Sequence, residues 1–458
     1  MTSVLLDIAN RLTSRTRFSA KAIGLARDAV LDTLGCMIAG AQDASVKAVA
    51  DAFASDMPGN GQHRLITGGR AIPSLAAFIN GTAAHALDFD DNFHPARAHA
   101  SAVLVPALLA VIGPDRPVSG HQLLEAYLTG LEAQAAVGFG LNPSHYNRGW
   151  HGTSTVGAIG TAAGVARLLG ADTERTVQAM SLAASMASGP KGQFGSLAKP
   201  MHAGIAARNA VEAAKLALAG AAGRLDILER PQGILDLFGG DEPRGWHDWR
   251  PDDAHIIEPR GLVTKRHPCC ASTHRAIDAL QDLVREHDLS ASDVEHIDVK
   301  VGLSAARNLA YPEPINEMQA RFSMQYCLAT ALVNGSLSLA DFSGSHHLRA
   351  PALMTRMRSI AMQSYSAEEE RGHERLPHLV TVTLRDGRRL TASRLHAKGA
   401  AEDPLGADER KAKFVDCMAW AGNTAGDASY QRAFAMLDGD DMWRALGELF
   451  DNVLPPVP

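Results

Sequence analysis

Hydrophobic residues in the first two thirds of the chain recur at steps of three and four positions, the spacing of one face of an α-helix. After Ser19, for example, Ile23, Val30 and Leu34 lie on one apolar stripe, and Gly40 supplies a stop signal. Six later stretches repeat the pattern, at 74–87, 103–112, 120–138, 155–169, 173–187 and 204–219. The pattern therefore predicts a large helical domain.

Three glycines, Gly157, Gly160 and Gly164, fall inside the predicted helix 155–169. A glycine inside a helix costs about 1 kcal/mol relative to alanine. We expect that the missing side chains let a neighbouring helix or a ligand come close.

The pattern changes after Lys265. Alternating residues at 294–301 predict a strand, and 379–391 predicts a hairpin with Asp386 and Gly387 at its turn. Helical spacing flanks these strands and returns near the end of the chain, at 272–286, 322–333, 408–420 and 440–451. The predicted fold is mainly α, with a smaller α+β domain inserted before the C-terminal helices. The expected boundaries are 1–265 for the helical domain, 266–398 for the small domain and 399–458 for the segment that returns to the helical domain.

The composition is that of an ordinary globular protein. Hydrophobic residues make up 46% and charged residues 21%, while aromatic residues are only 5%, so the core is expected to be aliphatic and rich in alanine. The net charge of -6 argues against a general nucleic-acid binder but leaves room for a small anionic substrate.

The cysteines and the apolar runs bear on location. Five cysteines without a CxxC pair are typical of reduced thiols in a cytoplasmic protein. The start of the sequence has too short an apolar run for a signal peptide. The longest run, 102–112, is broken by Pro106 and is shorter than a membrane span. We therefore expect no membrane partner and a cytoplasmic location.

The densest chemistry lies at 85–101, which holds three histidines, three carboxylates and an arginine. Such a mixture beside an apolar run is costly unless the groups pair, bind or catalyse. If the helix from Ser74 continues, His85 and Asp88 share one face, as do Asp88 and Asn92. Alternatively, Asp88 caps a helix or pairs with Arg97. The spacing matches no tight metal-ligand pattern, so no metal is predicted.

Two further segments carry isolated polar groups. His151 stands between glycines before a predicted helix and is expected to be exposed, while the hydroxyls that follow it can cap that helix. Lys199 ends a glycine-rich loop at a helix entrance, where an anionic ligand would offset its charge. The loop lacks the spacing of a P-loop. The alternative for Lys199 is a solvated surface side chain.

The last candidates come from the small domain. Lys265 and Arg266 add cations at the proposed domain junction, where clefts often form. Cys270 follows another cysteine and is interpreted as a packing residue. Tyr326 lies on an amphipathic helix, where a tyrosine is usually a core residue with a hydrogen-bonded hydroxyl.

Together with 32–40, these five segments in this order resemble the MmgE/PrpD family over most of the chain. The resemblance implies a large all-α domain, a smaller α+β lid domain, a homodimer and a cleft that uses no cofactor. It assigns catalytic roles to five residues, Asp88, His99, His151, Lys199 and Tyr326. It also places Lys265 in the pocket, and Cys270 at the position of a pocket residue. We expect these two residues, together with Asn92 and Arg266 from the same candidate segments, to bind substrate.

From the resemblance we expect a lyase that moves a proton next to a carboxylate of a small di- or tricarboxylate. Dehydration of the 2-methylcitrate type is favoured, and decarboxylation of the cis-aconitate type and epimerisation of the iminodisuccinate type are the alternatives. Cys270 stands where the decarboxylase pattern has a histidine, and the loop 94–99 is one residue longer than in that pattern. Two other classes stay open: a metal-dependent hydrolase that uses 85–99, and a non-catalytic binding protein.

Overall fold

The computed structural model describes residues 3–56, 61–249, 253–344, 350–373 and 375–453. The chain divides into two compact units. The first unit contains residues 1–193, 197–264 and 406–458, and the second contains 194–196 and 265–405. The second unit is therefore inserted into the first, and the last helices of the chain belong to the first unit again.

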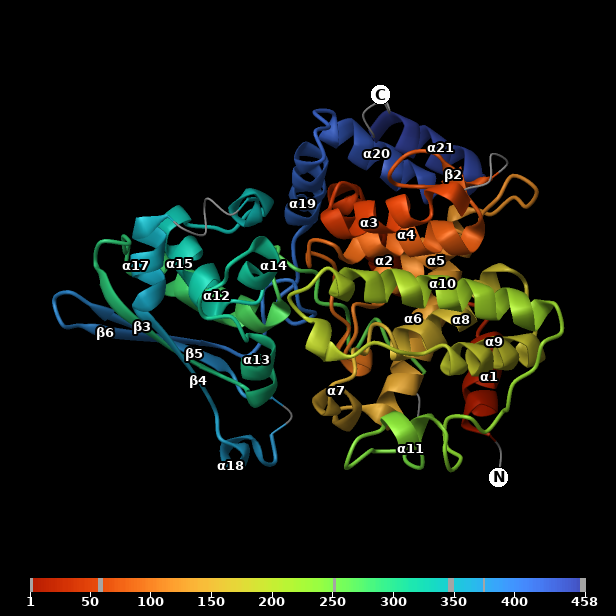
Figure 1. The fold of residues 1–458 in the computed structure, drawn as a ribbon, viewed down its shortest axis with the longest axis horizontal. Helices are drawn as coiled ribbons and strands as arrows, with labels where there is room; N and C mark the ends of the chain where they lie inside the picture. Colours follow the sequence, from red (N-terminus) through yellow and green to blue (C-terminus); the bar gives the residue numbers. More distant parts are fainter. Residues whose placement is uncertain (1–2, 57–60, 250–252, 345–349, 374, 454–458) are drawn as a thin grey trace. The chain divides into compact units, whose positions relative to one another are not determined.

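The first unit is built mainly from helices, with one small antiparallel sheet of β1 (His63–Arg64) and β2 (Arg70–Ala71) (Figure 1). Side chains of serine and aspartate cap several of them, as Ser19 does for α2 and Ser119 for α6. All seven helices predicted for this part are present, with ends that shift by up to six residues. The helices before the inserted unit are α1 (Val4–Ser14), α2 (Ala20–Gly40), α3 (Ala44–Ala52), α4 (Pro73–His85), α5 (Ala100–Leu109), α6 (Gly120–Leu141), α7 (Ser144–Arg148), α8 (Val156–Leu168), α9 (Thr173–Ser185), α10 (Ala198–Leu218) and α11 (Ile234–Phe238).

Glycines let the central helices of this unit approach one another closely. A methyl group added at Gly81 of α4 would lie 2.8 Å from the Cα of Gly204 in α10, so the two backbones are in contact. A methyl group at Gly160 of α8 would lie 2.5 Å from the backbone nitrogen of Gln134 in α6. The expectation that glycines in 155–169 admit a neighbouring helix is confirmed for Gly160.

Gly40 also serves packing. It is the last residue of α2, as predicted, but it does not adopt the left-handed conformation of a glycine stop. A side chain there would collide with the carbonyl oxygen of Ala83 in α4. Close approach of α2 and α4 is therefore what requires glycine at this position.

The second unit combines a four-stranded sheet with helices, of which α12 and α15 contact the strands (Figure 1). The strand order is β4-β3-β5-β6, with β3 parallel to β4 and antiparallel to β5, and with β5 antiparallel to β6. The predicted hairpin is confirmed as β5 and β6, and Gly387 at its turn has a φ of 86°. The elements are α12 (Ala271–Glu286), β3 (Val294–Val301), α13 (Leu303–Asn308), α14 (Glu317–Ala320), α15 (Met324–Asn334), α17 (Pro351–Arg358), β4 (Ile360–Ser364), α18 (Ala367–Glu370), β5 (His378–Leu384) and β6 (Arg389–Arg394).

Three C-terminal helices complete the first unit: α19 (Ala407–Trp420), α20 (Gly426–Met436) and α21 (Met442–Val453). Helix α19 packs on α2. Its Lys413 is buried and lies 2.7 Å from a carboxylate oxygen of Asp32 in α2. The same ammonium donates a hydrogen bond of 2.8 Å to the carbonyl of Phe89. The end of the chain therefore holds a loop that lies more than 300 residues earlier.

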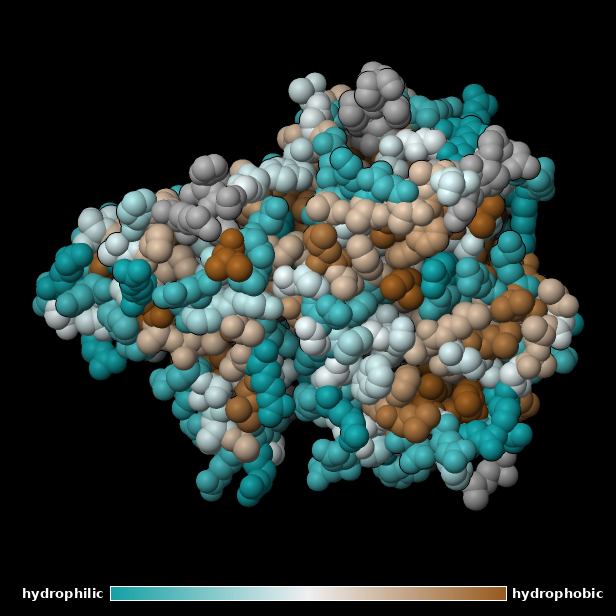
Figure 2. Space-filling view, in the orientation of Figure 1, coloured by the Kyte–Doolittle hydropathy of each residue, from teal (hydrophilic) through white to brown (hydrophobic). Residues whose placement is uncertain are grey.

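On the face drawn in Figure 2, brown hydrophobic side chains are interspersed with teal hydrophilic ones. Among the described residues, no helix combines the length and the apolar character needed to cross a membrane.

Candidate functional site

The ends of four helices of the first unit meet around a cluster of buried polar side chains. Helix α4 ends at His85, and α5 begins directly after His99. His151 lies in the turn before α8, and Lys199 lies in the first turn of α10. The contact between Gly81 and Gly204 brings α4 and α10 together, and these helices carry His85 and Lys199.

The loop after α4 has an unusual backbone. Asp88 has a φ of 52°, the left-handed region that non-glycine residues rarely adopt and that is common at functional sites. The prediction that the helix continues through Asp88 is therefore wrong, because α4 ends at His85. Asn92 then pairs with Val263 through two backbone hydrogen bonds of 3.0 and 2.8 Å, and together with Lys413 this pairing holds the loop in place.

Lys199 and Asp88 form a buried ion pair. The Nζ of Lys199 donates a hydrogen bond of 2.7 Å to Oδ1 of Asp88, and the two residues are 2% and 3% exposed. Nε2 of His99 lies 3.8 Å from the same oxygen. The alternative of a solvated surface side chain for Lys199 is therefore wrong, because the residue is buried and bonded to Asp88. Removal of one partner would take away a charge-assisted hydrogen bond from the other, which stays buried.

Asp90 orients two imidazoles. Nδ1 of His85 lies 3.0 Å from both carboxylate oxygens of Asp90, and Nδ1 of His99 lies 3.1 Å from Oδ2. Burial raises the pKa of Asp90, but the facing imidazoles outweigh it and hold this pKa well below its usual range. Burial lowers the pKa of His85 to about 3, although Asp90 opposes the change. His85 is therefore neutral at pH 7.

The tautomer of His85 follows from this arrangement. An ionised carboxylate only accepts hydrogen bonds, so Nδ1 of His85 carries the proton and Nε2 presents a lone pair. This Nε2 is buried and has no hydrogen-bond partner among the described residues. A buried acceptor without a donor is rare, and here it marks a position that a ligand can satisfy.

His151 is buried rather than exposed, which corrects the prediction. Its Nδ1 lies 3.1 Å from Nδ1 of His202 in α10. Burial, reinforced by the charge of Lys199, holds the pKa of His151 well below its usual range. The same two causes lower the pKa of His202 to about 4. Both imidazoles are therefore neutral at pH 7.

The three hydroxyls after His151 make hydrogen bonds to other parts of the site instead of capping α8. Thr153 accepts a hydrogen bond of 3.0 Å from the backbone N–H of His99. Ser154 donates one of 3.3 Å to the carbonyl of His202. Thr155 occupies the position before α8 but makes no side-chain cap, because its hydroxyl contacts His145 at 2.7 Å. Capping by these residues was therefore a wrong prediction.

A second buried hydrogen-bond network involves Asp91 of the loop after α4. The hydroxyl of Ser101 donates to the carboxylate of Asp91 and lies 2.7 Å from the hydroxyl of Tyr127. Burial raises the pKa of Asp91 to about 7, against the opposing hydrogen bond from Ser101. Asp91 therefore holds its proton through most of the acidic range.

The remaining predicted residues belong to the second unit. Lys265 is fully buried, whereas the side chain of Arg266 is 43% exposed and lies 3.9 Å from Asp278. Cys270 is the residue before α12, and its backbone N–H donates a hydrogen bond to the carbonyl of Arg321. Tyr326 is buried in α15 and its hydroxyl donates to the carbonyl of Asp341. Burial raises the pKa of Tyr326 to about 12.

The structure adds Asp90 and His202 to the candidates, and it pairs His85, already considered with Asp88, with Asp90. His85 and Asp90 both belong to the segment 85–101, but the helical reading of that segment put His85 beside Asp88 instead of Asp90. His202 stands three residues after Lys199, the spacing of one helical face, and this spacing was the signal that could have identified it.

Comparison with known families accounts for nearly the whole chain. The MmgE/PrpD N-terminal domain matches residues 9–247, and the MmgE/PrpD C-terminal domain matches 267–438. The chain belongs to the MmgE/PrpD family. This confirms the predicted family, and the helical fold with its small sheet-containing unit confirms the predicted fold class.

Relatives in this family carry two activities in their names. Cis-aconitate decarboxylase of Mus musculus is 29% identical over 356 residues, which cover 75% of this chain and 72% of that protein. The human protein of the same name is also 29% identical, with the same coverage. The 2-methylcitrate dehydratase of Cupriavidus necator is 25% identical over 440 residues, or 91% of this chain and 88% of that protein. Both activities are lyase reactions, in agreement with the expected enzyme class.

Proposed function

We propose that this lyase dehydrates a small hydroxylated di- or tricarboxylate of the 2-methylcitrate type, without a metal or an organic cofactor. The observation that carries the proposal is the buried, unpartnered Nε2 of His85, whose tautomer Asp90 fixes. Dehydration begins with removal of a proton from the carbon next to a carboxylate, and this step requires a positioned base. Decarboxylation requires no such base, since the carbanion forms by loss of carbon dioxide.

In the first part of the reaction, Nε2 of His85 accepts the proton and the electrons of the C–H bond form the new double bond. The hydroxyl on the neighbouring carbon leaves, and it takes up a proton to depart as water. From the resemblance, Tyr326 is predicted to supply this proton, which its raised pKa retains at neutral pH. The low pKa of His85 rises when substrate binds, because the carboxylates offset the charge of Lys199.

Binding of an anion is supported by charge and by helix ends. Lys199 supplies an ammonium group, and α5, α8 and α10 all begin beside the cluster, so their partly positive N-termini favour negative charge. The same groups stabilise the enolate-like charge that forms when the proton leaves. The roles of Asn92, Lys265, Arg266 and Cys270 in holding substrate stay predictions, as does the homodimer implied by the resemblance. The cytoplasmic location, expected from the cysteines, also stays a prediction.

Decarboxylation of the cis-aconitate type is the second candidate. It is favoured by the identity to the decarboxylases of Mus musculus and Homo sapiens, 29% against 25% for the dehydratase of Cupriavidus necator. For this reaction the site needs only cations for the carboxylates and a donor that protonates the carbanion.

Proton NMR in D2O tests the two candidates. Metal-stripped protein is offered 2-methylcitrate, citrate, cis-aconitate and iminodisuccinate in turn. New olefinic signals from a hydroxy acid support dehydration, loss of carbon from cis-aconitate supports decarboxylation, and deuterium uptake without net conversion indicates epimerisation. If every substrate stays unchanged and protonated, the proposal fails.

Variants then test the base. We expect His85→Gln to lower the dehydration rate by about 10²–10⁴-fold, the usual contribution of a general base. His121→Gln is the matched control, because His121 is exposed on α6 and pairs only with Glu125. Near-normal dehydration by His85→Gln would remove His85 from the mechanism.

A further inference from the structure

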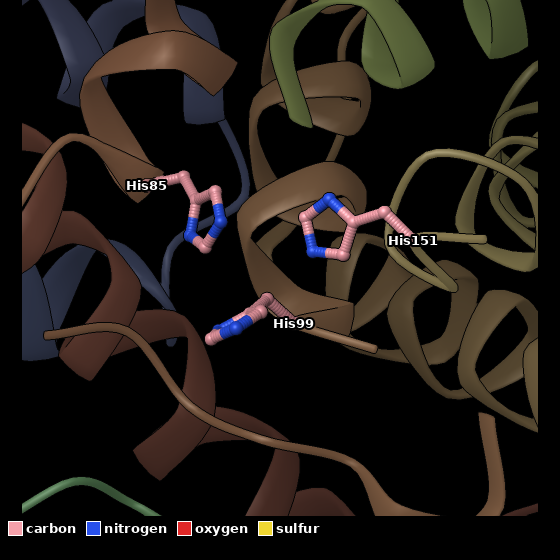
Figure 3. Close-up of side chains that lie close together, drawn as sticks. All are labelled: His85, His99 and His151. Atoms are coloured by element: carbon pink, nitrogen blue, oxygen red, sulfur yellow. The ribbon is translucent and has the colours of Figure 1, made fainter. Parts of the chain in front are cut away.

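Three histidines of the first unit form a cluster suited to a metal ion. His85, His99 and His151 each offer a ring nitrogen, and these three atoms lie within 4.8 Å of one another. Figure 3 shows the three rings around a common space. They come from the end of α4, the residue before α5 and the turn before α8, so three separate elements fix the cluster.

Neighbouring residues contact one nitrogen, Nδ1, of each of the three rings. Asp90 lies 3.0 Å from Nδ1 of His85 and 3.1 Å from Nδ1 of His99. His202 lies 3.1 Å from Nδ1 of His151. A histidine whose one nitrogen contacts a carboxylate is the arrangement found around protein-bound zinc. In addition, the buried Nε2 of His85 has no hydrogen-bond partner among the described residues.

Geometry and charge are compatible with a divalent ion. Zinc binds imidazole nitrogen at about 2.0–2.1 Å, which places tetrahedral ligands roughly 3.4 Å apart. The rings would therefore need to move by less than about 1 Å each. The carboxylates of Asp88 and Asp90 lie beside the histidines, and Asp88 offers a further ligand atom within 4.8 Å of those of His85 and His99.

We propose that the three-histidine cluster binds a divalent transition-metal ion of the Zn²⁺ class, and that the bound ion inhibits the enzyme. Three imidazoles and an open fourth position are a common ligand set for such ions. The binding rests on the cluster geometry alone. The inhibition rests on the proposed function, because the ion takes the lone pair of His85 that accepts the substrate proton.

Metal titration of the full chain, stripped of metal, tests the binding without any substrate. We expect one Zn²⁺ per chain by calorimetry, and visible absorption typical of tetrahedral Co²⁺ when Co²⁺ is the probe. His85→Gln should abolish both signals, and Asp90→Asn should weaken Zn²⁺ binding by about 10–100-fold through the loss of ring orientation. His121→Gln should bind as the unaltered protein does.

The outcomes separate the two parts of the proposal. Binding that survives in both His85→Gln and His151→Gln, in protein shown to be folded by circular dichroism, overturns the metal site. Zn²⁺ that binds at one per chain but leaves turnover unchanged, or raises it, overturns the inhibition. If the metal-free protein turns over none of the carboxylates, the proposed function fails while the metal titration still reports on the site.

Discussion

The contact between Gly81 and Gly204 predicts that a larger residue at position 81 disturbs the site. This contact lies between α4 and α10, the helices that carry His85 and Lys199. In Gly81→Ala the new methyl group would lie 2.8 Å from Cα of Gly204 and 3.3 Å from the carbonyl oxygen of Ala203. Two carbon atoms in contact are ordinarily about 3.5–4.0 Å apart. Because both neighbours are backbone atoms of a helix, α4 and α10 have to separate by about 1 Å.

This separation sets the expected magnitudes. Overpacking typically costs about 1–3 kcal/mol, and alanine returns about 1 kcal/mol of helix propensity, so the net loss of stability is about 0–2 kcal/mol. The hydrogen bond between Lys199 and Asp88, now 2.7 Å, lengthens beyond hydrogen-bonding range. A misplacement of about 1 Å can cost about 10²-fold in rate. We therefore expect a large loss of turnover with a small loss of stability.

The assay measures kcat and KM from olefin formation, and the free energy of unfolding from urea titration. Gly24→Ala in α2 is the matched control, since a methyl group at this exposed helical position meets no atom within 4 Å. It should raise stability by up to about 1 kcal/mol and leave the kinetics unchanged. Wild-type kcat in Gly81→Ala would refute the reasoning, because the site would then tolerate the helix separation.

Three further predictions concern stability. Lys413→Met should lower the free energy of unfolding by about 3–5 kcal/mol in urea titration, because it leaves Asp32 buried without its partner; a loss below about 1 kcal/mol would contradict this. Asp91 holds its proton up to about pH 7 in the folded state but only to about pH 3.9 when unfolded, so wild-type stability should fall as pH rises between these values. Asp91→Asn should lack this fall, and parallel pH profiles of the two proteins would show that Asp91 is not its cause. Thr153→Val should cost about 1–3 kcal/mol in thermal unfolding, because the N–H of His99 loses its acceptor, and an unchanged melting temperature would argue against this contact.

Periodicity predicted the helices of the first unit well, because long apolar stripes report directly on the buried face. The hairpin of β5 and β6 was equally accessible, since Asp386 and Gly387 suit its turn and the alternation on both sides fixes the register. The loop at Asp88 was not predictable in this way. Its left-handed backbone is held by Val263 and Lys413, which lie far away in the sequence.

The functional roles of the candidate residues stay predictions. The structure brings side chains from 85–101 and Lys199 into one buried cluster, but sequence spacing did not predict how they pair. Sequence spacing could not show that Asp90, rather than Asp88, faces His85. The backbone leaves the helical path at the end of α4, and this turn determines which carboxylate reaches His85. Nor could the spacing show that Thr155 contacts His145 instead of capping α8.

The ion pair between Asp32 and Lys413 has a consequence for how the protein is made. The two residues are 381 positions apart, so at about 5–20 residues per second the ribosome adds Lys413 about 20–75 s after Asp32. During that interval the nascent chain contains α2 and the loop at Phe89 but not the ammonium group that holds them. The first unit therefore cannot finish folding until its C-terminal helices have been synthesised. A nascent chain released before α19 would lack the ion pair between Lys413 and Asp32 and the hydrogen bond to Phe89, and should be a preferred client of chaperones.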